Sequence, residues 1–231
     1  MSVSPSSPVP PAADSAGRFA VRDLACVRGQ RLVFEGLSVS IGDGGALLLR
    51  GPNGSGKSTL LRCLAGLLRP AAGAILWDGA AVAAEPEAHR RRLRYLGHQE
   101  AVKPQLTVIE NLRFGISLAG ADSAKTEPAL AALGIATLAG LPARYLSAGQ
   151  RRRLALARLV AAPAPLWLLD EPLAGLDDAA VGLFTALVAA HRAAGGIAVL
   201  SVHGDFALPG AVVVDLAAVA PLRRTAAEPA A

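Results

Sequence analysis

Alternation of apolar and polar residues marks two extended segments near the start of the chain. The stretches RFAVRDLACV (18–27) and LVFEGLSVSI (32–41) alternate as half-buried antiparallel strands do. The next stretch, ALLLRG (46–51), is a short continuous apolar run, which is typical of a parallel strand buried on both faces. The pattern therefore predicts a mixed sheet core with a small antiparallel part.

The rest of the chain alternates between helices and strands. Gly and Pro punctuation between apolar runs predicts helices at 57–68 and 178–194 and a helix-rich segment at 107–161. Further strands are predicted at GAILWDG (73–79), RRLRYLGHQ (91–99), LWLLD (166–170), IAVLSV (197–202) and AVVVDL (211–216). This order predicts an α/β domain at 18–217 that contains a helical subdomain at about 103–160.

Composition indicates a folded, soluble chain. Of the 231 residues, 52% are hydrophobic and 18% are charged, which excludes disorder for most of the chain. The longest apolar runs are shorter than the roughly 18 residues that a membrane-spanning helix needs. Residues 1–17 are rich in Pro and Ser and lack the pattern of a signal peptide. We expect this segment and residues 218–231 to be disordered tails.

Arginine clusters at 90–94 and 151–153 account for much of the formal net charge of +5. Such clusters occur in proteins that bind nucleic acid. Aromatic residues are not interleaved with them, so we interpret both as solvated faces and expect no nucleic-acid partner. The two cysteines, Cys26 and Cys63, form no CxxC motif and have no nearby pair of histidines. This usage fits a reducing compartment and implies no cysteine metal site.

A glycine-rich loop follows the predicted strand at 46–51. The residues GPNGSGKST match the phosphate-binding pattern G-x-x-x-x-G-K-[S/T] and lead into a predicted helix. In such a loop, main-chain amides surround a polyphosphate, the lysine reaches the outer phosphates and the serine hydroxyl holds Mg2+. A purely structural turn is the alternative. The predicted nucleotide-binding residues are Gly51, Pro52, Asn53, Gly54, Ser55, Gly56, Lys57, Ser58 and Thr59, with Ser58 as a metal ligand.

The loop alone leaves kinases, GTPases, recombination ATPases and transport ATPases open, and an acidic pair narrows the choice. Asp170 and Glu171 end the apolar run of PLWLLDEP (165–172), at the carboxyl edge of a predicted parallel strand, where α/β proteins bind ligands. We expect Asp170 to act near Mg2+ and Glu171 to polarise the water that attacks the terminal phosphate. Capping of the next helix is the alternative role for the pair.

The stretch LSAGQRRRLALARL (146–159) predicts a helix that begins with small residues. An apolar stripe at Leu156, Leu159 and Val160 predicts that the helix docks on a core. The main-chain amides at its start and the Ser147 hydroxyl are typical of a second phosphate-binding surface. Because this surface lies in the helical segment, we expect it not to reach the nucleotide of its own chain. A two-fold dimer, in which each chain closes over the ATP of the other, is the simplest solution.

Taken in order, these motifs resemble the nucleotide-binding subunit of ATP-binding cassette (ABC) transporters, over about residues 18–214. LSAGQ is similar to the family signature LSGGQ, with alanine in place of one glycine. The resemblance implies a P-loop ABC ATPase domain in which Glu171, His203, Gln99 and Lys57 are catalytic and Ser58, Gln99 and Asp170 hold Mg2+. It also implies further ATP contacts from Ser147, Ala148, Gly149, Gln150 and Asp177.

One position departs from the family pattern. ABC ATPases usually stack an aromatic residue on adenine, and the matching place in CVRGQ is Arg28. A guanidinium plane can also stack on a base, so adenine binding remains possible. Selectivity for adenine over guanine stays open.

Four longer stretches resemble the ATPase of the cytochrome c maturation system, the haem-exporter branch of the family. They are LACVRGQRLVFEGLSVSI, LRYLGHQEAVKPQLTVIENLRF, LSAGQRRRLALARL and PLWLLDEPLAGLD. The resemblance implies a homodimer, bound peripherally to integral membrane subunits of that haem-exporter complex, at the cytoplasmic face of the bacterial inner membrane. No direct haem binding is expected, because the chain has no CxxCH or other haem-attachment pattern around His89, His98, His191 and His203.

The membrane subunits are expected to contact the surface near Gln99 and the helical subdomain. In the predicted helix TVIENLRF (107–114), the candidates for this contact are Ile109, Leu112 and Phe114. Packing of the same helix within its own subdomain is the alternative.

Two other functions stay open. An ABC ATPase for a drug, lipid or metal cargo has the same motifs. ABC ATPases of chromosome maintenance, DNA repair or translation act on nucleic acid, but the first two carry long coiled coils and the third carries two cassettes. Neither feature is present here. A small-molecule kinase does not need LSAGQ.

Overall fold

The computed structural model describes residues 17–219 of the chain. The predicted tails at 1–17 and 218–231 therefore lie almost wholly outside the described residues. At the inner ends of these tails, Gly17 donates its N–H to Ser40 Oγ (3.0 Å), and the last helix, α7 (Leu216–Val219), includes two tail positions.

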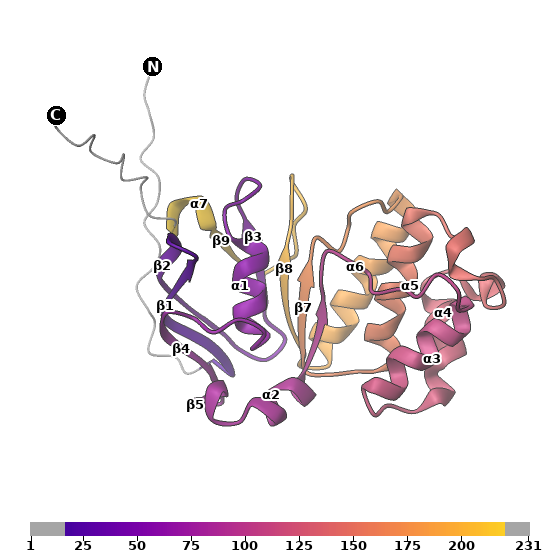
Figure 1. Ribbon diagram of the computed structural model, residues 1–231, viewed down its shortest axis with the longest axis horizontal. Helices are drawn as coiled ribbons and strands as arrows, with labels where there is room; N and C mark the ends of the chain where they lie inside the picture. The colour runs from indigo at the N-terminus through magenta and orange to yellow at the C-terminus, as the bar shows by residue number, and fades with distance from the viewer. Residues whose placement is uncertain (1–16, 220–231) are drawn as a thin grey trace, which may run out of the picture.

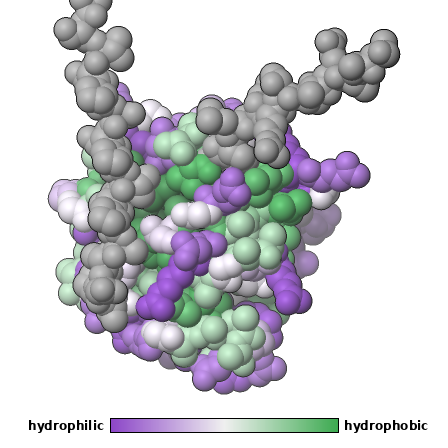
Figure 2. Space-filling view, turned by 90° about the vertical axis from the view of Figure 1, so that its left-hand side faces the viewer, coloured by the Kyte–Doolittle hydropathy of each residue, from purple (hydrophilic) through white to green (hydrophobic). Residues whose placement is uncertain are grey.

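The alternating segments near the start of the chain form an antiparallel sheet with the strand order β2-β1-β4-β5 (Figure 1). Its strands are β1 (Phe19–Arg28), β2 (Arg31–Ile41), β4 (Ala72–Trp77) and β5 (Ala80–Ala81). Figure 2 shows the molecule from the side of this sheet, where small apolar areas are separated by polar residues. Such mixing is typical of a sheet with one face on the core and the other toward solvent.

The continuous apolar runs form a second sheet, in which all neighbouring strands are parallel and the order is β6-β7-β8-β3-β9. Its strands are β3 (Ala46–Arg50), β6 (Leu93–Leu96), β7 (Leu166–Asp170), β8 (Ile197–Ser201) and β9 (Val212–Asp215). The predicted α/β class is confirmed. Parallel and antiparallel pairing occur in separate sheets.

The parallel sheet lies between two hydrophobic cores. In β3, Leu47 and Leu49 pack with the antiparallel sheet and α1 (Lys57–Leu64), whereas Ala46 and Leu48 pack with the helices on the opposite face. β7 and β8 alternate in the same way. Burial on both faces explains why these strands are continuous apolar runs in the sequence.

The helices on the opposite face include the predicted helical segment (Figure 1). This segment contains α3 (Val108–Leu118), α4 (Thr126–Ala132) and α5 (Ala148–Ala161), and α6 (Asp178–Ala193) lies beside it. Capping boxes start two of these helices: Thr107 pairs with Glu110 at α3, and Ser147 pairs with Gln150 at α5. Within the described residues, no helix is both long and apolar enough to cross a membrane.

Two predicted boundaries were wrong. The predicted helix at 57–68 ends at Leu64, because Gly66 adopts a left-handed conformation (φ 70°) that terminates the helix. The predicted strand at 91–99 begins only at Leu93, because Arg91 and Arg92 belong to α2 (Pro86–Arg92). A proline in the first turn favours this short helix.

Candidate active site

The predicted phosphate-loop, acidic, Gln99 and His203 positions lie at one edge of the parallel sheet. The glycine-rich loop follows β3, Gln99 follows β6, Asp170 and Glu171 lie at the end of β7, and His203 follows β8. These strands are parallel, so their carboxyl ends meet at the same edge. Ligands of open α/β sheets bind at this edge.

A cavity of about 390 Å³ lies over the glycine-rich loop. The loop leads into α1 through Gly56, whose φ of 105° a side chain rarely permits. Lys57 is 5% exposed, and its Nζ donates to the carbonyl oxygens of Gly51 (2.7 Å) and Pro52 (3.1 Å). The residues that line the cavity are Arg28, Arg31, Val33, Asn53, Gly54, Gly56, Lys57, Ser58, Thr59 and Glu171.

Asp170 is held by a serine that the sequence analysis missed. Ser201 Oγ, at the end of β8, donates to Asp170 Oδ1 (2.7 Å) and accepts the main-chain N–H of Glu171 (2.8 Å). Asp170 is 1% exposed, and its Oδ2 is buried with no hydrogen-bond partner among the described residues. Such an oxygen fits a divalent cation, which prefers carboxylate and hydroxyl oxygens. A serine in an apolar strand is the signal that was available in the sequence.

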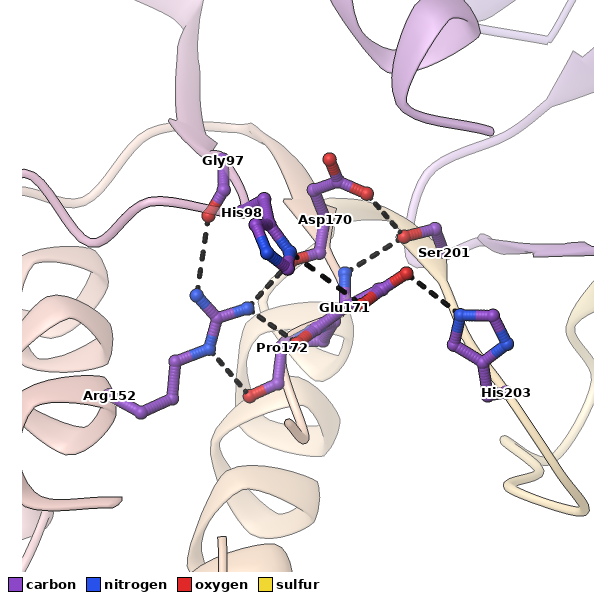
Figure 3. A network of polar contacts seen from close by, with 8 residues as sticks. All are labelled: Gly97, His98, Arg152, Asp170, Glu171, Pro172, Ser201 and His203. Atoms are coloured by element: carbon purple, nitrogen blue, oxygen red, sulfur yellow. Dashed lines mark hydrogen bonds and ion pairs between the residues drawn. The ribbon is translucent and has the colours of Figure 1, made fainter. Parts of the chain in front are cut away.

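Glu171 lies between two imidazoles (Figure 3). His203 Nε2 is 2.8 Å from Glu171 Oε1, and His98 Nδ1 is 3.7 Å from Oε2. The hydrogen bond to His203 lowers the pKa of Glu171 against the effect of partial burial, and the electrostatic effect of the nearby His203, His98 and Lys57 side chains acts in the same direction as the hydrogen bond. Glu171 is therefore a carboxylate at neutral pH, and His203 Nε2 donates to it.

Arg152 corrects the interpretation of the arginine clusters. We expected 151–153 to form a solvated face, but Arg152 is 2% exposed and donates to the main-chain carbonyls of Gly97, Asp170, Glu171 and Pro172 (Figure 3). The helical stripe through Leu156 and Leu159 extends back by one turn to position 152, so the spacing contained the signal.

The arginine cluster at 90–94 is also partly buried. Arg94 is partly buried, and its Nε donates to the carbonyl of Ala162 (2.7 Å) at the end of α5. Its neighbour Arg91 is exposed, as expected, and pairs with Glu87 (3.8 Å) one helical turn earlier. The prediction of a solvated face was therefore wrong for Arg94 and Arg152.

Comparison with known proteins assigns the family. The model of the ABC transporter family matches residues 34–174. The chain belongs to the ABC transporter family. It is 58% identical over 219 residues to a protein of Rhodospirillum rubrum named cytochrome c biogenesis ATP-binding export protein CcmA. This alignment covers 92% of this chain and 93% of the R. rubrum protein.

Solved structures agree with this assignment. An ATP-binding subunit of an ABC transporter superposes with a TM-score of 0.72 at 28% identity, over 80% of this chain and 79% of that one. A dimeric ATP-binding cassette in a post-hydrolysis state with ADP and phosphate has the same fold, with a TM-score of 0.72 at 23% identity over 80% and 88% of the two chains. The chain is thus an ABC-type ATP-binding protein and an ATPase.

The LSAGQ segment of this ABC ATPase starts α5. Ser147 Oγ accepts the N–H of Gln150 (3.2 Å), and Gln150 Oε1 accepts the N–H of Ser147 (2.9 Å). Ala148 is exposed. A Cβ at Gly149 would lie 2.7 Å from the carbonyl oxygen of Gly175, so this close approach requires glycine. Among the described residues that line the cavity, none comes from α5.

The remaining predicted site residues are exposed. Gln99 lies in a bend after β6, and Arg28 lies at the cavity mouth beside Arg31, which the sequence analysis missed. Asp177 caps α6, and its Oδ1 accepts the N–H of Ala180 (2.8 Å). This local hydrogen bond fixes the carboxylate at the start of the helix.

The predicted contact residues of α3 fall into two groups. Leu112 is fully buried and Ile109 is packed against the core, so Leu112 cannot meet a partner, and that prediction was wrong. Phe114 is 43% exposed and Leu118, one turn further, is 75% exposed. Phe114 and Leu118, and not Ile109 and Leu112, form the exposed apolar surface of α3.

Proposed function

We propose that the chain is the ATP-hydrolysing subunit of a membrane ABC complex for cytochrome c biogenesis, with ATP held between two copies of the chain. One observation carries the hydrolytic part: a carboxylate, Glu171, forms a wall of the phosphate-loop cavity and is kept ionised by His203. The 58% identity to the R. rubrum protein supports the pathway. We take residues 18–217 as the ABC domain and about 103–160 as its helical subdomain.

The phosphate loop binds the triphosphate of ATP. Main-chain amides of residues 51–56 and the start of α1 form the anion-binding surface. Lys57 Nζ exchanges the carbonyl oxygens of Gly51 and Pro52 for phosphate oxygens, which are stronger acceptors because they are charged. Arg28, at the mouth of the cavity, stacks on the base.

Ser58, Asp170 and Gln99 would hold Mg2+. The unpartnered Oδ2 of Asp170 and the Ser58 hydroxyl at the cavity wall support this assignment. When bound, Mg2+ neutralises charge on the phosphates. Ser201 fixes the other carboxylate oxygen of Asp170, so only Oδ2 remains for a ligand.

Glu171 acts as the general base. A water attacks the terminal phosphorus, the bond to the bridging oxygen breaks, and the proton of the water passes to the Glu171 carboxylate, giving ADP and phosphate. His203 donates to the other oxygen of that carboxylate and holds its orientation. Lys57 offsets the negative charge that develops on the phosphates.

A second copy of the chain completes the site. Ser147, Ala148, Gly149 and Gln150 provide the start of α5. The capping box uses the N–H groups of Ser147 and Gln150, so the amides of Ala148 and Gly149, together with the helix dipole, favour phosphate. The absence of α5 residues among the described lining of the cavity supports an assignment to the partner's ATP. Asp177, at the start of α6, lies in the loop that we assign to the dimer interface.

The membrane subunits bind at α3 and the loop that contains Gln99. Phe114 and Leu118 provide exposed apolar surface, and Lys103 Nζ lies 4.9 Å from the Phe114 ring centroid. The chain then lies peripherally at the cytoplasmic face of the bacterial inner membrane. It drives the complex without binding haem or nucleic acid itself.

The proposal is tested by ATP hydrolysis in membranes and in detergent, with and without the membrane subunits, alongside cytochrome c maturation. We expect Lys57→Ala, Glu171→Gln and Ser147→Arg each to lose hydrolysis, by at least about a hundredfold, together with maturation. Hydrolysis lost while c-type cytochromes still mature contradicts the pathway. Normal hydrolysis by Glu171→Gln contradicts the assignment of the base.

A further inference from the structure

Arg152 joins three parts of the site through main-chain atoms alone. From α5, its Nε donates to the Pro172 carbonyl (3.2 Å), one terminal nitrogen donates to Gly97 (3.3 Å), and the other donates to Asp170 (2.6 Å) and Glu171. A guanidinium that is 2% exposed and forms these contacts is costly to bury unless its donors are satisfied. Carbonyl dipoles provide this compensation here.

The main chain that Arg152 holds is strained at the residue that matters for hydrolysis. Glu171 has a φ of 49°, in the left-handed region that side chains rarely adopt. Its N–H is fixed by Ser201 Oγ and its carbonyl by Arg152, so both sides of the residue are restrained. These restraints direct the carboxylate toward His203.

The same helix also holds the loop that contains Gln99. Arg152 binds the Gly97 carbonyl before Gln99, and Arg158, on the same helix, binds the carbonyls of Glu100 (2.8 Å) and Ala101 (3.0 Å) after it. A Cβ at Gly115 would lie 3.1 Å from Arg158 Nε, so glycine there leaves room for this guanidinium. α5 therefore fixes both ends of the loop.

We propose that Arg152 is a positioning residue for ATP hydrolysis. It fixes the positions of the Glu171 main chain and of the start of the Gln99 loop relative to α5. The inference rests on the proposed role of Glu171 and adds a residue to it. The first residue of α5 is part of LSAGQ, so a movement of this helix is transmitted to Glu171 by the Arg152 side chain. Arg158 holds the loop but not Glu171, so the two arginines have separable effects.

The test measures kcat and KM for ATP of the full-length chain in membranes that contain its partner subunits. We expect Arg152→Gln to lower kcat by about a hundredfold, since small displacements of a catalytic group are costly, and to leave KM within about twofold. Arg152→Lys retains the charge but not the fork of donors, so it recovers only part of kcat. Arg158→Gln is expected to lose less than Arg152→Gln.

The split between kcat and KM separates positioning from a general loss of structure. A displaced Glu171 slows the chemical step and leaves the phosphate loop intact, so kcat falls while KM for ATP stays within about twofold. With kcat referred to the amount of chain that binds ATP, a defect that only reduces the amount of folded protein leaves kcat in place.

Arg192 provides a matched control outside the site. Its guanidinium also donates to main-chain carbonyls, those of Gly44 (2.8 Å) and Pro209 (2.9 Å). We expect Arg192→Gln to keep the kcat and KM of the unaltered chain. An Arg152→Gln chain with unaltered kcat, while Glu171→Gln is inactive, overturns this inference alone. An active Glu171→Gln chain overturns the proposed function instead.

Discussion

At the scale of single residues, the end of β7 depends on groups that satisfy buried polar atoms. Asp170 is buried, and within residues 17–219 one of its two carboxylate oxygens is bonded only to Ser201, whose hydroxyl also accepts the Glu171 N–H. Ser201 is itself fully buried, so water cannot replace it. The serine therefore contributes to stability and to the geometry of both acids.

We expect Ser201→Ala to lower the free energy of unfolding by about 2 kcal/mol, because it leaves a buried carboxylate oxygen and an N–H without partners. Denaturant titration measures the change. The matched control is Ser117→Ala, which removes an exposed helical hydroxyl bonded to the Phe114 carbonyl and is expected to cost less than about 0.5 kcal/mol. Equal losses in the two variants contradict the account.

At the scale of elements, α2 is held on α1 by a buried histidine. His89 is 1% exposed, and its Nε2 donates to the Leu64 carbonyl (2.8 Å) at the end of α1. Burial lowers the pKa of His89, with the positive charge of Arg92 acting in the same direction. Burial also lowers the pKa of His191, which stacks on Trp167 at 3.8 Å between ring centroids.

These two histidines give stability a defined pH dependence. Both have a lower pKa in the folded chain, so between the folded and unfolded pKa values the unfolded chain binds more protons. The free energy of unfolding is expected to rise from mildly acidic pH to about pH 7, where the histidines of the unfolded chain have lost their protons. His89→Gln should reduce this slope and His89→Gln/His191→Gln should reduce it further. An unchanged slope in the double variant, measured by denaturant titration across this range, contradicts the assignment.

Local structure could be predicted from the sequence where a motif is contiguous. The phosphate loop, the acidic pair and the start of α5 each lie within one short stretch, so local geometry follows from residue order. The partners of Ser201 and Arg152 could not be predicted in this way, because they lie 18 to 55 residues away in the sequence. The strand order β6-β7-β8-β3-β9, which brings these segments together, is not evident from chain order.

At the scale of the whole molecule, two parts of the surface have separate roles in the proposed hydrolysis of ATP between two copies of the chain. The carboxyl edge of the parallel sheet holds the phosphate loop and Glu171, whereas LSAGQ starts a helix in the helical part beside it (Figure 1). In the proposed function, closure of two copies would bring each LSAGQ to the ATP of the other. To shift the equilibrium between open and closed copies from mostly open to mostly closed, ATP must favour the closed state by about 5 kcal/mol. Two shared sites meet this demand more readily than one.

The molar mass of the purified Glu171→Gln chain in solution, with and without ATP, tests the shared site most directly. Without the base, ATP persists, so we expect the mass to double when ATP is added. A Glu171→Gln/Ser147→Arg chain should bind ATP and keep the mass of one chain, because the arginine obstructs the start of α5. A single-chain mass at saturating ATP in the first variant, or doubling in the second, contradicts the account.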